Sequence, residues 1–228
     1  RLSQMVKKYM WYYHYARGKC RATFSMPDDL FFKTEPKEEM HTICRYALLD
    51  RDIDQIVALD TRQVAEMFDY IMEHQEMLMT ELRELDNVRA DEVADAFRSG
   101  KPLAQALWHQ LERVIAFGAG EYYDATTHMK QFTGQIPHNN GYYYTEETIY
   151  GRAVADDSDL FETLPYTGFH EYLPLEEDNA TTVLPTNTKR GVPYQLVVTN
   201  NAGLYRYVTD HIVCIQETQM DKILFTIY

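Results

Sequence analysis

The sequence predicts an α/β protein with a partial central sheet flanked by helices and a more antiparallel C-terminal part. Three observations support this class. Apolar residues recur at helical spacing between about residues 37 and 98. A buried strand pattern, a glycine loop and a helix then follow one another from Val114 onward. Strand-like segments without intervening helices fill the last third of the chain.

The helical part contains three predicted helices. Residues 37–57 show apolar positions three and four apart, and residues 61–85 carry the clearest stripe with a period of 3.6. Asp60 is a suitable N-cap for this second helix, with Gln63 three residues later. A shorter helix is predicted at Ala90–Arg98, before a glycine and a proline that favour its end.

The pattern changes after Leu107. The apolar run Val114–Phe117 is closed by Gly118-Ala119-Gly120, as expected for a buried parallel strand that ends in a loop. A helix is predicted near residues 125–132 and another strand at Gly141–Tyr144, which gives the alternation of an α/β fold. The later predicted strands are Phe169–Leu175, Tyr194–Thr199, His211–Gln216 and Ile223–Tyr228.

Composition excludes several classes of protein. The 228 residues include 22 Lys+Arg and 35 Asp+Glu, a formal net charge of -13, which argues against a nucleic-acid partner. The basic, aromatic stretch of residues 1–25 is of a composition that can stack on single-stranded nucleic acid, but the acidic remainder would repel it. The alternative is a surface helix or an edge segment with its Tyr and Trp side chains packed inward. No apolar run reaches about 18 residues, so no membrane span is expected. Three cysteines, an odd number, favour a reducing, cytoplasmic setting.

Two histidine–cysteine pairs carry the types of ligand that zinc prefers: His41 with Cys44, and His211 with Cys214. The second pair falls in a predicted strand, where positions i and i+3 point to opposite faces. We therefore expect no zinc site, and nothing in the sequence marks either thiol as an activated nucleophile.

Three polar loops each follow or end a predicted strand: Gly118–Gly120, Thr145–Glu147 and Gly203–Asp210. Ligands of open α/β sheets collect at such strand ends, so these loops are the candidate site. The sequence has no glycine-rich phosphate loop of the Walker or dinucleotide type.

One segment carries a specific resemblance. Tyr194–Tyr207 reads YQLVVTNNAGLYRY and resembles the signature of the auxin-responsive promoter, or Gretchen Hagen, family of acyl acid–amido synthetases. These enzymes belong to the adenylate-forming superfamily. Weaker segments at Leu107–Gly120, Gly141–Gly151 and Glu171–Leu175 are similar to family segments in the same order. The resemblance runs from about residue 35 to the end and implies part of the large domain of an adenylate-forming enzyme.

The resemblance implies ATP and Mg²⁺ as cofactors, with a small carboxylic acid and an amino acid as substrates. Tyr142 and the Thr145-Glu146 pair match the superfamily's Tyr-x-x-Thr-Glu element, in which the hydroxyl meets phosphate and the carboxylate holds the metal. A register anchored on Gly151 instead places Glu147 at the Mg²⁺ position. The alternative is that both glutamates simply lie on the surface of a loop.

Two further segments are assigned to the nucleotide by the same resemblance. Gly118, Ala119 and Gly120 are expected to line the adenine or acyl pocket, because small residues let a ligand approach the backbone; the alternative is an ordinary strand-to-helix turn. Tyr205 and Arg206 lie in the block where the family holds nucleotide, although Arg206 is equally suited to a structural ion pair.

The chain also departs from the family pattern. The family's ribose-binding Asp falls on His211, with Asp210 one residue early, so either a local shift lets Asp210 serve or the ribose contact is weakened. The family's phosphate loop and C-terminal lid do not appear. We therefore expect residues 1–228 to be an internal fragment, mainly helical over about 35–106 and sheet-rich over 107–228, and inactive alone. The alternative is a non-catalytic relative that binds a nucleotide, an acyl ligand or a protein partner.

Overall fold

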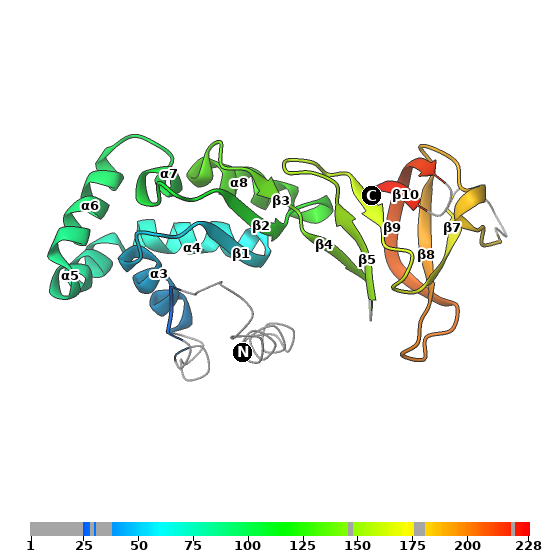
Figure 1. Ribbon diagram of the computed structural model, residues 1–228, viewed down its shortest axis with the longest axis horizontal. Coiled ribbons are helices and arrows are strands. Elements are labelled where there is room, and N and C mark those ends of the chain that lie inside the picture. The colour runs from blue at the N-terminus through cyan, green and yellow to red at the C-terminus, as the bar shows by residue number, and fades with distance from the viewer. Residues whose placement is uncertain (1–24, 28–29, 31–37, 146–147, 176–180, 220–221) are drawn as a thin grey trace. The chain divides into compact units, whose positions relative to one another are not determined.

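A computed structural model describes residues 25–27, 30, 38–145, 148–175, 181–219 and 222–228 (Figure 1). The chain divides into two compact units. The helical unit takes the described residues up to Asp54, Glu66–Leu111 and Phe132–Gly134, and the sheet unit takes Gln55–Ala65, Glu112–Gln131 and Gln135–Tyr228. The predicted α/β class is confirmed. The basic, aromatic stretch of residues 1–25 lies, apart from Ser25, outside the described residues.

Amphipathic helices that share one apolar core form the helical unit. They are α3 (Glu39–Leu49), most of α4 (Thr61–Glu73), α5 (Gln75–Leu85), α6 (Asn87–Arg98) and α7 (Leu103–Leu107). Phe68, Ile71, Leu78 and Leu82 have no exposed surface. The Phe68 ring also stacks on Phe132 with 5.2 Å between ring centroids. Within the described residues, no helix is long and apolar enough to span a membrane.

The predicted helix over residues 61–85 is two helices. Asp60 caps the first as predicted, since its Oδ1 accepts the Gln63 N–H at 3.2 Å. The break falls at His74, whose backbone leaves the helical region with φ -105° and ψ 22°. Its imidazole Nδ1 lies 3.1 Å from the Tyr70 carbonyl oxygen and so competes for a helical acceptor. The apolar stripe resumes beyond the break at Leu78, which explains why the sequence pattern looks continuous.

The predicted helix over residues 37–57 ends early, at Leu49, and Gln55–Asp60 forms strand β1 instead. The helix stops because Asp50 adopts an extended conformation, with φ -78° and ψ 126°. Residues 55–60 then pair in parallel with a distant strand, and this pairing outweighs their local helical pattern.

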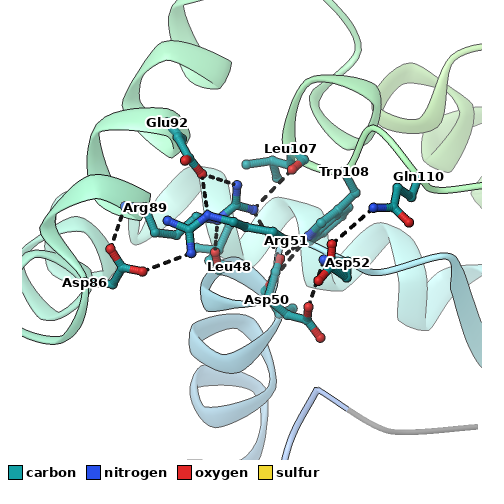
Figure 2. Close-up of polar contacts among 11 residues, drawn as sticks. Leu48, Asp50, Arg51, Asp52, Asp86, Arg89, Glu92, Leu107, Trp108 and Gln110 are labelled. Carbon is teal, nitrogen blue, oxygen red and sulfur yellow. Dashed lines mark hydrogen bonds and ion pairs between the residues drawn. The ribbon is translucent and has the colours of Figure 1, made fainter.

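The buried guanidinium of Arg89 joins two helix ends in the helical unit (Figure 2). Its Nε donates to the Leu48 carbonyl at 2.7 Å, and its Nη2 donates to the carbonyls of Asp50 at 3.2 Å and Leu107 at 3.1 Å. The indole Nε1 of Trp108 donates to the Asp50 carbonyl as well, at 3.1 Å. These carbonyls lie at the C-terminal ends of α3 and α7, where they have no helical partner and a positive charge is favoured.

A small parallel sheet opens the sheet unit. Its strand order is β1, β2 (Arg113–Phe117), β3 (His138–Asn139). The 3₁₀ helix η1 (Gly120–Tyr122) and helix α8 (Tyr123–Thr133) connect β2 to β3. The predicted buried strand, glycine loop and helix are therefore confirmed, with β2 as the central strand of the three.

A larger antiparallel sheet follows, whose strand order is β4 (Tyr142–Thr145), β5 (Thr148–Ala153), β6 (Phe161–Thr163), β10 (Lys222–Ile227), β9 (Tyr207–Gln219), β8 (Pro193–Thr199), β7 (Phe169–Pro174). The strand predicted at Gly141–Tyr144 does not extend the parallel sheet, because it is the first strand of this one. Gly141 lies between the two sheets with φ +65°, a left-handed conformation that redirects the chain after β3.

The antiparallel sheet curls around its own core. Four strands separate β5 from β7 in the strand order, yet the hydroxyl of Tyr150 lies 2.8 Å from that of Tyr172. The ring of His170, also on β7, packs edge-on against Tyr150 at 4.8 Å. Only a curved sheet brings side chains of these two strands into contact. The buried cluster inside includes Phe161, Leu196, Val213, Ile215 and Phe225.

Candidate functional site

The turn after β2 fits tightly around Gly118. Its N–H donates to Asn140 Oδ1 at 2.8 Å, and its carbonyl accepts from Thr126 Oγ1 at 2.9 Å. A Cβ at this position would lie 2.3 Å from Thr126 Oγ1, 2.7 Å from Thr61 Cγ2 and 2.9 Å from His138 Cε1. Only glycine fits here, and the reason is the surrounding side chains.

The next two residues also make protein contacts. Ala119 is 3% exposed and belongs to the core cluster of the antiparallel sheet. Gly120 begins η1 with φ +61°, and a Cβ there would lie 3.1 Å from Ile227 Cγ2. These contacts are those of a well-packed strand-to-helix turn, the alternative raised by the sequence. A role in a ligand pocket remains a prediction.

A buried polar network around Gly118 was not predicted from the sequence. His138 and Asn140 are 3% and 2% exposed. A ring nitrogen of His138, Nε2, lies 2.8 Å from the Ala116 carbonyl, and burial lowers the pKa of this imidazole. The hydroxyl groups of Thr61 and Thr126 form a hydrogen bond, with 3.0 Å between their oxygens. These residues come from separate segments, so no local pattern groups them.

Strand β4 alternates between exposed and buried side chains, which separates Tyr142 from Thr145. Tyr142 is 47% exposed, whereas Thr145 is 3% exposed. The Thr145 Oγ1 is buried and has no hydrogen-bond partner among the described residues. The predicted metal ligands Glu146 and Glu147 follow directly but lie outside the described residues. In the part of the chain that the structure describes, no group of three His, Cys, Asp or Glu side chains is arranged to hold a metal ion.

His211 is joined to β4 by Tyr143, a residue that the sequence did not single out. The hydroxyl of Tyr143 lies 2.6 Å from His211 Nδ1, and the two rings meet edge-on at 5.3 Å. The ring of Phe117, which ends β2, stacks on Tyr143 with 5.7 Å between centroids. The tertiary structure therefore brings together the turn after β2, strand β4 and position 211.

Asp210 lies in an irregularity of strand β9. Gln195 and Val197 of β8 pair with Ile212 and Val208, so three β9 residues, Thr209–His211, lie opposite one β8 residue. Thr209 is fully buried, its hydroxyl donating to the Leu196 carbonyl at 3.0 Å, and Asp210 is exposed. This irregularity leaves the Asp210 carboxylate in solvent, and whether Asp210 takes the ribose-binding role remains a prediction.

Tyr205 and Arg206 lie at the β8–β9 hairpin. Tyr205 is 81% exposed. Arg206 has a left-handed backbone, φ +46°, and its Nε donates to Glu171 Oε2 at 3.0 Å. Its Nη2 donates to Thr182 Oγ1 at 2.9 Å. The ion pair that the sequence left open is thus present, and the hydrogen bonds from Thr182 and then Arg206 lower the pKa of Glu171.

A separate open groove of about 800 Å³ lies over strands β9 and β10. Its lining includes Arg190, Gln216, Glu217 and Thr226, and it contains no residue predicted for the site. Among the predicted residues, His211 contacts Tyr143, and Arg206 contacts Glu171 and Thr182.

Comparisons with known proteins agree with the motif. Residues 161–225 match the model of the GH3 family central domain. A curated relative from Oryza sativa subsp. japonica, described as "Putative indole-3-acetic acid-amido synthetase GH3.10", is 29% identical over 117 residues, which are 48% of this chain and 24% of the relative. The chain thus spans about a quarter of that relative's length.

Solved structures support the fold. A GH3.15 acyl acid amido synthetase superposes with a TM-score of 0.79 over 92% of this chain and 42% of that one, at 16% identity. AtGH3.15 in complex with 2,4-DB superposes with a TM-score of 0.72 over 85% of this chain and 39% of that one, at 17% identity. The resemblance that the Tyr194–Tyr207 motif predicts is therefore confirmed: residues 161–225 are similar to the central domain of the GH3 family.

Proposed function

We propose that the chain is part of the large domain of an ATP-dependent amido synthetase, which joins a small carboxylic acid to an amino acid. The motif Tyr194–Tyr207 and the match over residues 161–225 support this activity. The relatives' names support it as well, since they are amido synthetases. We also propose a cytoplasmic location, which the free thiols of Cys44 and Cys214 favour.

The reaction has two steps. A carboxylate is a poor electrophile, so its oxygen first attacks the α-phosphorus of ATP, and the bond to the β-phosphate oxygen breaks to release pyrophosphate. The amine of the amino acid then attacks the activated carbonyl carbon, loses a proton, and displaces AMP. Charge develops at the α-phosphate in the first step, where hydroxyl donors and Mg²⁺ stabilise it.

Thr145 is the observation that carries this proposal. A buried hydroxyl without a partner costs free energy, and none of the described residues supplies an acceptor for Thr145 Oγ1, so an acceptor on a ligand would satisfy it. A phosphate oxygen is such an acceptor, and the residue lies in the Tyr-x-x-Thr-Glu element. The carboxylates of Glu146 and Glu147 are of the type that Mg²⁺ prefers, and one of them is proposed to hold it.

The other proposed nucleotide contacts come from the turn after β2, the start of β4 and the β8–β9 hairpin. The backbone at Gly118–Gly120 is proposed to approach the adenine or acyl group, and Gly118 is already held in place by Asn140. Tyr142, Tyr205 and Arg206 are proposed to contact nucleotide from the exposed sides of β4 and the β8–β9 hairpin. Of Asp210 and His211, Asp210 is the one that presents its side chain to solvent.

The test is ATP–pyrophosphate exchange by the full-length protein with a panel of small carboxylic acids, auxin-like acids included. Acid-dependent exchange that requires Mg²⁺ is the expected result. Absence of exchange with every acid, while the protein is folded, would contradict an adenylating activity.

A non-catalytic relative that binds a nucleotide, acyl ligand or protein partner is the second candidate. The contact between Tyr143 and His211 favours it, because the resemblance puts His211 in the slot of the family's ribose-binding Asp, and this imidazole is bound to Tyr143. Nucleotide binding by calorimetry without any pyrophosphate exchange is the outcome that separates this candidate from the enzyme.

A further inference from the structure

Arg206 makes more hydrogen bonds to the protein than is usual for an exposed arginine. Its side chain is 52% exposed, yet three different residues fix its backbone and guanidinium. Thr199 Oγ1 accepts its backbone N–H at 3.0 Å, Glu171 Oε2 accepts from Nε at 3.0 Å, and Thr182 Oγ1 accepts from Nη2 at 2.9 Å.

Glu171 and Thr182 also bind each other. The Thr182 hydroxyl donates to Glu171 Oε1 at 2.6 Å, so the two carboxylate oxygens are divided between the threonine and Arg206. The Glu171 side chain is only 13% exposed, which limits its freedom. The three side chains form a closed ring of hydrogen bonds that leaves Nη1 of Arg206 and one Nη2 hydrogen outside it.

The backbone of Arg206 is strained. A residue with a Cβ at φ +46° costs about 1 kcal/mol, and such conformations persist where surrounding contacts enforce them. An exposed ion pair contributes little to stability, so stability alone is a weak reason for this arrangement. The pair between Arg152 and Glu162 illustrates the difference, since it joins two regular neighbouring strands without strain.

We propose that Glu171 and Thr182 are positioning residues, which orient the Arg206 guanidinium toward an anionic phosphate oxygen of the bound nucleotide. This inference rests on the proposed function, which places Arg206 at the nucleotide. An arginine fixed through Nε presents the outer edge of its guanidinium in one direction, and fixing it in advance lowers the entropy cost of binding an anion.

The experiment measures the affinity of the full-length protein for AMP and for adenosine by calorimetry. Glu171→Gln and Thr182→Val are each expected to weaken AMP binding about fivefold and to leave adenosine binding unchanged. Glu162→Gln is the matched control, because Glu162 is 16% exposed and pairs with an arginine that is 54% exposed. This control is expected to bind AMP like the wild type.

A double-mutant cycle separates positioning from general structure. In an Arg206→Gln background, Glu171→Gln is expected to have no further effect on AMP binding. An equal loss of AMP and adenosine binding, or a Glu171→Gln effect that persists in this background, would overturn the positioning role. The positioning role would also be overturned if the Glu171→Gln protein bound AMP as tightly as the Glu162→Gln control.

The proposed function fails in a different way. If the wild-type protein binds neither ATP nor AMP, the nucleotide site itself is wrong, and the positioning role falls with it. If the wild type binds AMP and supports exchange but Glu171→Gln matches the control, only the positioning role is overturned.

Discussion

Tyr143 and His211 are 68 residues apart in the sequence and meet at 2.6 Å between the tyrosine hydroxyl and His211 Nδ1. Strands β4 and β9 are not neighbours in the sheet, so this hydrogen bond spans its curved interior. Because the Tyr143 ring also stacks on Phe117, the hydrogen bond connects His211, a predicted nucleotide-binding residue, with the core around Phe117.

Tyr143→Phe removes this hydrogen bond while keeping the ring contacts. We expect a loss of about 1–2 kcal/mol in the free energy of unfolding, because the bond is lost in a largely buried setting. Urea denaturation measures the change. Tyr166→Phe is the control, since Tyr166 is 95% exposed, and an equal effect of the two variants would contradict a stabilising role for the bond.

Thr145→Val tests whether the buried hydroxyl serves a ligand. The residues that the structure describes give this oxygen no partner, so its removal is expected to leave stability unchanged or to raise it by about 1 kcal/mol. Pyrophosphate exchange is expected to fall about 100-fold if the hydroxyl stabilises the α-phosphate. Thr145→Ser keeps the hydroxyl and should retain most activity. A strongly destabilised Thr145→Val protein would show that the hydroxyl is structural.

Gly118→Ala is expected to destabilise the sheet unit by about 2 kcal/mol, because its Cβ would collide with Thr126, Thr61 and His138. Thermal unfolding provides the measurement. Gly191→Ala serves for comparison: its φ is +76° but no atom lies within 4 Å of its Cβ position, so only about 1 kcal/mol of backbone strain is expected. An equal loss of stability in both variants would mean that the side chains around Gly118 do not exclude a Cβ at this position.

Stability should fall as pH drops below neutral. Burial lowers the pKa of His170 from 6.5 to about 4, and in the part of the chain that the structure describes its Nε2 has no hydrogen-bond partner. The unfolded chain therefore binds a proton between these values and the folded chain does not. The contribution of neutral His170 to the free energy of unfolding is complete above about pH 6.5. It is lost progressively toward pH 4, where the protein is less stable by about 3 kcal/mol. His138 acts in the same direction, since its pKa is lowered as well.

Denaturation between pH 4 and 7 checks this dependence. His170→Gln removes the titrating group and should flatten the slope, whereas His109→Gln, at an exposed position, should not. Equal slopes for the wild type and His170→Gln would show that His170 does not control the acid response.

Arg89→Met should destabilise the helical unit by about 3 kcal/mol. The substitution keeps much of the apolar side chain but leaves carbonyls of Leu48, Asp50 and Leu107 without these donors. Helical circular dichroism during urea denaturation follows the loss. Arg98→Met is the matched control on the same helix, because Arg98 is 74% exposed and its pair with Asp95 contributes little. A loss below about 1 kcal/mol for Arg89→Met would argue against the joining of the two helix ends.

The sequence by itself determined the class of fold, the glycine turn after β2 and the resemblance to the GH3 family. Apolar periodicity and turn residues act locally, so α6, the parallel strand β2 and the C-terminal strands follow from their own residues. The Tyr194–Tyr207 motif carried this resemblance because its residues are contiguous, and it lies within the segment that matches the GH3 central domain.

Only the tertiary structure decided the features that depend on distant partners. Strand β1 forms because it pairs with β2, and Tyr150 reaches Tyr172 because the sheet curls. The bulge at Thr209–His211 sets which side chain of that block faces solvent. Pairing register, curvature and buried hydrogen bonds arise between segments that are far apart in the chain, so their energies do not appear in any local pattern of residues.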